Sequence, residues 1–134
     1  PRPGYAPFDE VLAQADVLSL HCPHTPETDR MIGAPELAAM KRTAILVNTA
    51  RGKLVDETAL VAALKERRIH AAAVDVLPEE PPVNGNALLE PGIPNLIVTP
   101  HIAWASAEAK QRLADELIDV IEAWERGEPM NRII

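Results

Sequence analysis

Short apolar runs alternate with segments of helical periodicity along this chain, and this alternation limits its fold more than any other feature. Runs rich in Ala, Val, Leu and Ile predict buried strands, which lie at residues 16–22, 44–47, 71–76 and 96–99. Apolar spacings of three and four predict helices, which lie at residues 8–15, 35–40, 57–67 and 107–126. Strands that alternate with helices favour an α/β fold, with an open parallel sheet, right-handed crossovers and flanking helices.

Capping residues mark the ends of two of these helices. Asp56 and Ser106 can each accept a hydrogen bond from the first turn of the helix that follows. Gly127 and Pro129 then end the last helix. The longest expected loop covers residues 81–94, and loops of that length in compact domains are often functional. The last helix carries an apolar stripe of Leu113, Leu117, Val120, Ile121 and Trp124.

Three segments that follow predicted strands each carry one strongly functional side chain. Arg51 lies in the motif NTARG, Glu80 in DVLPEEPP and His101 in TPHIAW. Ligands of open α/β sheets bind in the crevice beyond the carboxyl ends of the strands. We therefore expect a cation, a carboxylate and an imidazole to meet in one active site at that edge of the sheet.

Arg51 has two interpretations. Its planar guanidinium can bind a carboxylate or a keto acid through two parallel hydrogen bonds, which Lys does poorly. The alternative is a surface arginine that pairs with Asp56 or Glu57, and position alone does not separate the two roles. Gly52 follows, and its lack of a side chain lets the backbone turn sharply or approach a ligand.

We interpret Glu80 and His101 as an acid/base pair. Prolines on both sides stiffen the loop that carries Glu80, although an isolated pair such as Glu79 and Glu80 is more often a solvated acidic loop. A carboxylate beside an imidazole favours the charged imidazolium and fixes its tautomer. A lone histidine is usually a packed or surface residue, so it is the expected partners of His101 that favour a catalytic role.

Asp75 lies near the end of the apolar run AAAVDV, where burying an unpaired carboxylate would be costly. At the carboxyl edge of a sheet, we expect this side chain to face a polar ligand or a loop amide. The alternative is that Asp75 caps the loop that follows the strand.

The composition and the remaining motifs exclude several classes of protein. The formal net charge of −7 argues against nucleic-acid and anionic-membrane partners, and no apolar run approaches the roughly 20 residues of a membrane span. His21, Cys22 and His24 have the chemistry of metal ligands, but adjacent strand residues point to opposite faces, so we predict no metal site. The single cysteine fits a reducing compartment, and we expect a cytoplasmic protein. Neither the G-x-S-x-G motif of serine hydrolases nor the G-x-G-x-x-G dinucleotide loop is present.

In this order and spacing, NTARG, DVLPEEPP and TPHIAW resemble the D-isomer-specific 2-hydroxyacid dehydrogenases, as does DVLSLHCPHTPETDRMI. The resemblance extends from about Asp16 to the last helix, and TPHIAWAS is closest to the glycerate dehydrogenase and hydroxypyruvate reductase branch. It implies that residues 1–134 are a single partial domain, the second half of a doubly wound, Rossmann-like domain that binds NAD or NADP. The parent would be an oxidoreductase that acts on a small 2-keto or 2-hydroxy acid, and we expect it to be a homodimer.

The resemblance also implies a role for each candidate residue. Arg51 would bind the substrate carboxylate and polarise the keto oxygen, and His101 would protonate that oxygen as hydride arrives from the nicotinamide. Glu80 would keep His101 protonated, and Asp75 would hold the nicotinamide carboxamide. Trp104 corresponds to a wall near the nicotinamide or the substrate, with core packing as the alternative. The positions expected to line the cofactor are Cys22, Thr49, Ala50, Arg51, Asp75, His101 and Ala103.

The first βαβ unit of such a domain, with its Gly-rich loop, has no counterpart in the chain, and neither has the substrate domain. The chain begins within the segment PRPG, which favours the interior of a longer protein. We expect the isolated chain not to bind NADH measurably and to self-associate through an edge strand at residues 16–22. The same scaffold also serves corepressor-like proteins that sense nucleotides, and fold alone does not exclude that alternative. Formate dehydrogenase-like members carry Gln where this chain has Glu80, which disfavours them.

Overall fold

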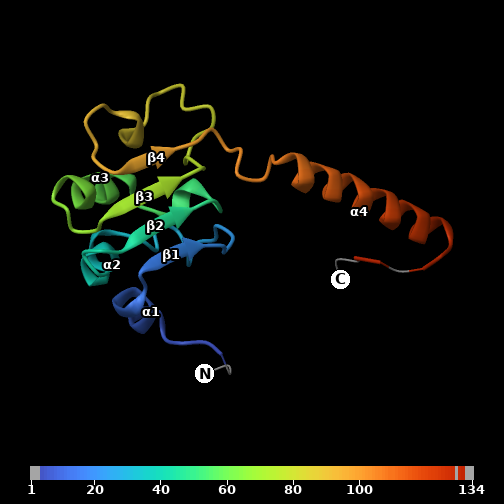
Figure 1. Ribbon diagram of the computed structural model, residues 1–134, viewed down its shortest axis with the longest axis horizontal. Coiled ribbons are helices and arrows are strands. Elements are labelled where there is room, and N and C mark those ends of the chain that lie inside the picture. The colour runs from blue at the N-terminus through green and yellow to red at the C-terminus, as the bar shows by residue number, and fades with distance from the viewer. Residues whose placement is uncertain (1–3, 129, 132–134) are drawn as a thin grey trace. The chain divides into compact units, whose positions relative to one another are not determined.

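The structure, a computed structural model, describes residues 4–128, 130 and 131 and confirms the expected order of helices and strands (Figure 1). Its helices are α1 (Phe8–Gln14), α2 (Ala34–Ala39), α3 (Glu57–Lys65) and α4 (Ala107–Glu125). Its strands are β1 (Val17–Leu20), β2 (Ile45–Asn48), β3 (Ala71–Val74) and β4 (Leu96–Val98). Short 3-10 helices, which the sequence did not predict, form at η1 (Gly52–Leu54) and η2 (Ala87–Leu89). The chain divides into two compact units between His101 and Ile102.

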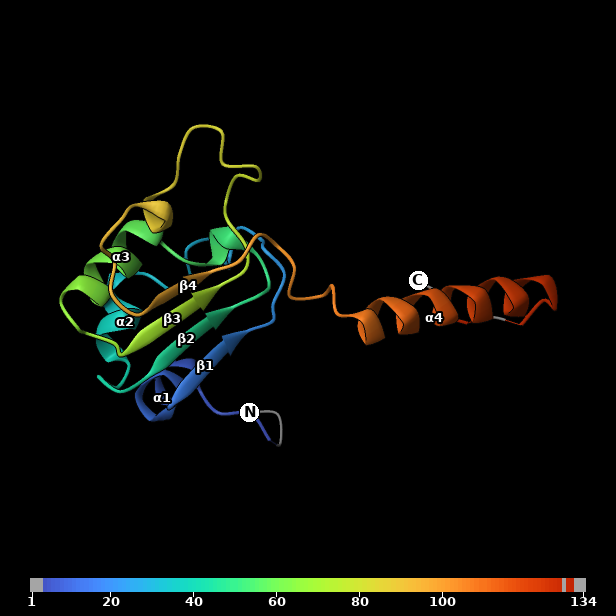
Figure 2. The ribbon, with the colours of Figure 1, turned by 45° about the horizontal axis from the view of Figure 1, so that its top comes forward.

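The four strands form one parallel sheet in the order β1-β2-β3-β4, so each strand lies beside the one that precedes it in the chain. The register aligns Leu18 with Leu46, Leu46 with Ala72 and Ala72 with Leu96. Successive right-handed crossovers that run in one direction place their helices on one face of a sheet. Figure 2 shows α1, α2 and α3 on the same side of the strands. The predicted parallel α/β fold is therefore confirmed.

The core lies between this sheet and the three helices. Alternate strand residues point into it, and both Leu60 and Leu64 of α3 are buried there, as their helical spacing predicts. Complete burial of a leucine side chain contributes about 1.5–3 kcal/mol, so a core of this kind can hold the unit together. Its central members are Leu12, Leu18, Leu20, Leu37, Leu46, Leu60, Leu64, Ala72 and Val74.

The other face of the sheet keeps large apolar side chains at the surface. Val17 on β1 is 58% exposed and Ile97 on β4 is 65% exposed. Among the described residues β1 also forms one edge of the sheet, where residues 16–22 were expected to lie. Self-association through this edge stays a prediction.

The second unit contains α4, which begins where the sequence predicts. The hydroxyl of Ser106 accepts a hydrogen bond from the Ala109 N–H, and Gly127 has the positive φ that commonly ends a helix. Pro129, expected to contribute to this end, lies outside the described residues. The apolar stripe is exposed within the unit, with Leu113 at 60% and Trp124 at 79%. Over the described part of the chain, no helix combines the length and apolarity needed to cross a membrane.

Candidate active site

Asp75 follows β3 and is the buried carboxylate of the site. Only 3% of the residue is exposed, and its Oδ1 accepts a hydrogen bond from the Thr99 hydroxyl. Its backbone joins three strand exits, because its N–H donates to the Asn48 carbonyl and its carbonyl accepts from the His101 N–H. The sequence predicted that Asp75 faces a polar ligand or a loop amide, and the Thr99 hydroxyl is a partner that was not predicted.

Glu80 and His101 form the pair expected from their motifs. The Nδ1 atom of His101 lies 2.6 Å from Oε2 of Glu80, while Oε1 accepts a 2.6 Å hydrogen bond from the Leu77 N–H. The Glu80 carboxylate is therefore held at both oxygens. The side chain of His101 is 47% exposed and that of Glu80 is 33% exposed, so the pair remains accessible to a ligand.

The protonation of this pair follows from the environment of Glu80. The pKa of the Glu80 carboxyl lies below its ordinary value of 4.5, chiefly because the Leu77 N–H donates to it and secondly because His101 does. At neutral pH this carboxylate is ionised and can only accept hydrogen bonds. Nδ1 of His101 must then carry the hydrogen of its contact with Glu80.

The loop that carries Glu79 and Glu80 is attached to α3, and within it the two glutamates have different partners. The amide of Asn84 donates to both oxygens of Glu79 at 3.0 and 3.2 Å, so Glu79 faces its own loop. Asn86 donates to both oxygens of Glu57 on α3 at 2.9 Å, and Leu88 is buried in the core. The two adjacent glutamates therefore have different partners, Asn84 for Glu79 and the Leu77 N–H and His101 for Glu80.

His101 has an unusual backbone conformation. Its φ is +54°, in the left-handed region that a residue with a side chain rarely adopts. Its N–H donates to the carbonyls of Asp75 and Thr99, which hold the backbone in this conformation. Such strain is often concentrated at functional sites, and the imidazole of this residue contacts Glu80.

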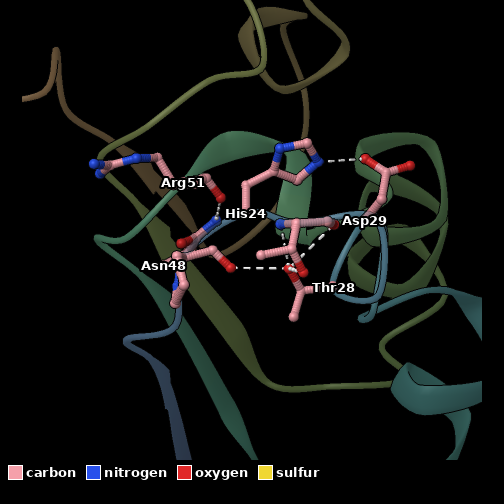
Figure 3. A network of polar contacts seen from close by, with 7 residues as sticks. His24, Thr28, Asp29, Asn48 and Arg51 are labelled. Atoms are coloured by element: carbon pink, nitrogen blue, oxygen red, sulfur yellow. Dashed lines mark hydrogen bonds and ion pairs between the residues drawn. The ribbon is translucent and has the colours of Figure 1, made fainter. Parts of the chain in front are cut away.

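Arg51 lies in a turn that Asn48 stabilises. The side chain of Asn48 is fully buried, donates to the Arg51 carbonyl at 2.9 Å and accepts from the Ala50 N–H at 3.1 Å. The exposed guanidinium of Arg51 donates to the Ala50 carbonyl, and Figure 3 shows it pointing away from His24 and Asp29. The structure records none of the alternative ion pairs of Arg51 among the described residues.

The acidic groups that could have paired with Arg51 have other partners. Asp56 lies 3.8 Å from the guanidinium of Arg30 and caps α3 by accepting from the Ala59 N–H. Glu57 accepts from Asn86. The guanidinium of Arg51 is therefore not committed to an ion pair with either Asp56 or Glu57.

A hollow of about 410 Å³ lies at the exits of β3 and β4. Asp75, Glu80, Thr99 and His101 supply its polar lining. Its apolar lining is formed by Leu77, Pro81, Pro82, Leu89, Val98 and Pro100. The hollow therefore combines an apolar wall with a few converging polar groups, as small-molecule sites do.

The remaining predicted residues lie outside the lining of this hollow. Cys22 follows β1, where its sulfur contacts that of Met31, and Thr49 and Ala50 follow β2 beside Arg51. Ala103 and Trp104 belong to the second unit, and Trp104 is 56% exposed. The structure brings together Asp75, Glu80 and His101 in the lining of one hollow, whereas Arg51, which was expected to meet them, lies outside that lining with these other residues.

His21 and His24 engage separate partners after β1. His21 Nε2 lies 2.8 Å from the Ser19 hydroxyl, and His24 Nε2 lies 2.7 Å from Asp29, a pair drawn in Figure 3. Within the part of the chain that the structure describes, no three His, Cys, Asp or Glu side chains converge on a metal-binding position.

We expect the replacement Glu80→Gln to change how stability depends on pH. Because the folded-state pKa is lowered, ionised Glu80 stabilises the fold above its ordinary pKa of 4.5, and this contribution is lost as the pH falls through the folded-state value. The melting temperature of the wild type should exceed that of Glu80→Gln at neutral pH, and the difference should shrink below about pH 4.5. Circular dichroism melts at stepped pH measure it, and a constant difference would contradict the assignment.

Comparisons with known proteins relate the sequence and the fold of this chain to one family. A family model described as the NAD binding domain of D-isomer specific 2-hydroxyacid dehydrogenases matches residues 2–103. A glycerate dehydrogenase of Methylorubrum extorquens is 55% identical over 131 residues, which cover 98% of this chain and 42% of that protein.

Solved structures of similar proteins share the fold of this chain. A D-isomer specific 2-hydroxyacid dehydrogenase from Lactobacillus delbrueckii ssp. bulgaricus, in its NAD-complexed form, matches with a TM-score of 0.81 and 33% identity, over 97% of this chain and 43% of that one. An acyclic imino acid reductase in complex with NADPH and D-Arg matches with a TM-score of 0.82 and 36% identity, over 96% of this chain and 40% of that one. The chain thus spans about two fifths of the length of these proteins.

Proposed function

The chain belongs to the D-isomer specific 2-hydroxyacid dehydrogenase family, and from that premise we propose that it carries the acid/base side of a dehydrogenase active site. The parent protein would transfer hydride between NADH or NADPH and the keto or hydroxy carbon of a small 2-hydroxy acid, such as D-glycerate or hydroxypyruvate. The observation that carries this proposal is the Glu80–His101 pair, which lines the same hollow as Asp75.

In this proposal His101 is the acid and base. Glu80 holds Nδ1, so Nε2 gives a proton to the keto oxygen during reduction and takes it back during oxidation. Glu80 acts through His101, because one oxygen of its carboxylate is held by the Leu77 N–H while the other holds Nδ1 and so fixes the direction of the ring. Arg51 binds the substrate carboxylate with two hydrogen bonds and polarises the keto oxygen.

The residues present fit the nicotinamide end of a dinucleotide. A buried carboxylate such as Asp75 can accept a hydrogen bond from the amide of the nicotinamide, and the apolar wall of the hollow suits a flat ring. When bound, the cofactor would supply the hydride. As the family resemblance implies, the rest of the cofactor would be lined by Cys22, Thr49, Ala50 and the backbone near Ala103.

The regulatory alternative has less support. The relatives compared above are two dehydrogenases and a reductase by name, and Glu80 contacts His101 as an acid/base pair requires. We further propose that the parent is a cytoplasmic homodimer without nucleic-acid or membrane partners, in keeping with the net charge of −7.

An assay of the full-length protein tests the proposed function. We expect oxidation of NADH or NADPH with hydroxypyruvate or glyoxylate, and much slower oxidation with a 2-imino acid, the alternative that the imino acid reductase relative suggests. The 134-residue chain alone should show no NADH binding by titration calorimetry, because it lacks a Gly-rich phosphate loop. Absence of turnover with every acid, together with recovery of a stable protein partner, would favour the regulatory alternative.

A further inference from the structure

Gly52 lies against the backbone of a distant loop. A β-carbon built on it would fall 2.1 Å from the carbonyl carbon of Leu77, 2.5 Å from its oxygen and 2.3 Å from the nitrogen of Pro78. Real β-carbons essentially never approach other atoms so closely, and backbone atoms cannot turn aside as the end of a side chain can. The φ of Gly52 is outside the left-handed region, so space rather than conformation requires glycine here.

The peptide group that Gly52 contacts, between Leu77 and Pro78, lies next to the acid/base site, because the peptide group directly before it supplies the N–H that binds Glu80. The N–H of Leu77 holds Oε1 of Glu80 at 2.6 Å, and Oε2 of the same carboxylate holds His101. On the other side, Gly52 follows Arg51, whose carbonyl is fixed by the buried Asn48. The contact at Gly52 thus connects the turn that carries Arg51 to Leu77, the residue whose N–H binds Glu80.

We propose that Gly52 is a positioning residue. Because it has no β-carbon, the Leu77–Pro78 peptide can pack directly against the turn that carries Arg51, and this packing fixes Glu80 against His101. A sharp turn or a ligand could each explain a glycine at this position, and the neighbour in the structure is the chain itself. The inference rests on the proposed function for its catalytic meaning, but its geometric content can be tested without any substrate.

Gly52→Ala is the direct test, with Gly33→Ala as the matched control. A β-carbon at Gly33 would lie 3.3 Å from the flexible end of Glu36 and 3.8 Å from the backbone oxygen of Arg30, which is an ordinary contact, so the control adds a methyl without moving a loop. Nuclear magnetic resonance of the 134-residue chain measures two signals. The ¹⁵N chemical shift of His101 Nδ1 reports its contact with Glu80, and the hydrogen-exchange protection of the Leu77 amide reports its bond to the same carboxylate. We expect both signals to change in Gly52→Ala as they do in Glu80→Gln, and neither to change in Gly33→Ala.

In the full-length protein, Gly52→Ala should lower kcat on the order of 10²-fold, because a displacement near 1 Å can cost that much. The pH profile of kcat should shift with it, as in Glu80→Gln, which a general loss of stability would not produce. Unchanged resonances at His101 and Leu77 in a folded Gly52→Ala chain would overturn the inference whatever the activity. Changed resonances without turnover in the wild type would instead overturn the proposed function alone.

A second variant covers the outcome in which Gly52→Ala does not fold. Pro78→Gly loosens the loop so that its peptide can move away from the added methyl, and the double variant Gly52→Ala/Pro78→Gly should fold. We expect the double variant to lose the Glu80–His101 signals that Pro78→Gly alone retains. Retention of those signals in the double variant would overturn the inference, as would failure of the double variant to fold while Pro78→Gly folds.

Discussion

Replacing His101 with Ala in the full-length protein is expected to lower kcat for keto-acid reduction by ~10²–10⁴-fold, the usual value of a positioned acid/base group. The physical reason is that Nε2 would be the source of the transferred proton, while Glu80 holds Nδ1 at 2.6 Å. Cofactor affinity should change far less than kcat, so the loss should remain at saturating NADH and substrate. Steady-state kinetics with hydroxypyruvate measure it.

Two further variants separate chemistry from backbone strain. Because φ at His101 is +54°, His101→Asn keeps a residue type that accepts the left-handed conformation yet still lacks the acid, and it should be as inactive as His101→Ala. His70→Ala removes an exposed histidine at the opposite end of β3 and should leave turnover unchanged. Turnover near the wild-type value in both His101 variants would show that another group supplies the proton.

Arg51→Lys is expected to reduce kcat/KM by roughly 10- to 100-fold, although it keeps the charge. A charge-assisted hydrogen bond contributes about 1.5–3 kcal/mol, and the round ammonium of Lys cannot reproduce two parallel bonds to a carboxylate. The structure supports this role because the guanidinium is exposed and its recorded partner is the neighbouring Ala50 carbonyl, not a carboxylate. Initial rates over a range of hydroxypyruvate concentrations measure the loss.

The matched control for this variant is Arg42→Lys, at an exposed arginine in the turn before β2. It makes the same chemical change away from the strand exits and should leave kcat/KM as in the wild type. A wild-type kcat/KM in Arg51→Lys would show that Arg51 is a surface arginine without a role in substrate binding, which is the alternative that its position in the sequence left open.

The regular elements could be predicted from sequence because local patterns determine them. The run AILV gave β2, the spacing of Leu60 and Leu64 gave α3, and Ser106 gave the start of α4. The strand exits then followed from topology, since parallel strands present their carboxyl ends at one edge. For this reason the meeting of Glu80 and His101 was predictable before any distance was known.

Contacts between distant loops could not be predicted in this way. Nothing near Thr99 in the sequence shows that its hydroxyl donates to Asp75, and nothing near Gly52 shows that Leu77 lies against it. The anchoring of residues 81–94 through Asn86 and Glu57 is of the same kind. These contacts depend on how the loops pack after the sheet has formed, and neither hydrophobic periodicity nor motif wording encodes that packing.

The strand order β1-β2-β3-β4 also bears on how this unit is made. Each strand pairs with the one synthesised just before it, so a nascent chain leaving the ribosome never has to wait for a later segment before its next pairing can form. Pairings between neighbouring βα units keep contacts comparatively local, which favours rapid folding for a parallel sheet. The four described strands can therefore join the sheet in chain order, and His101, which follows β4, would be the last residue of the acid/base site to be placed.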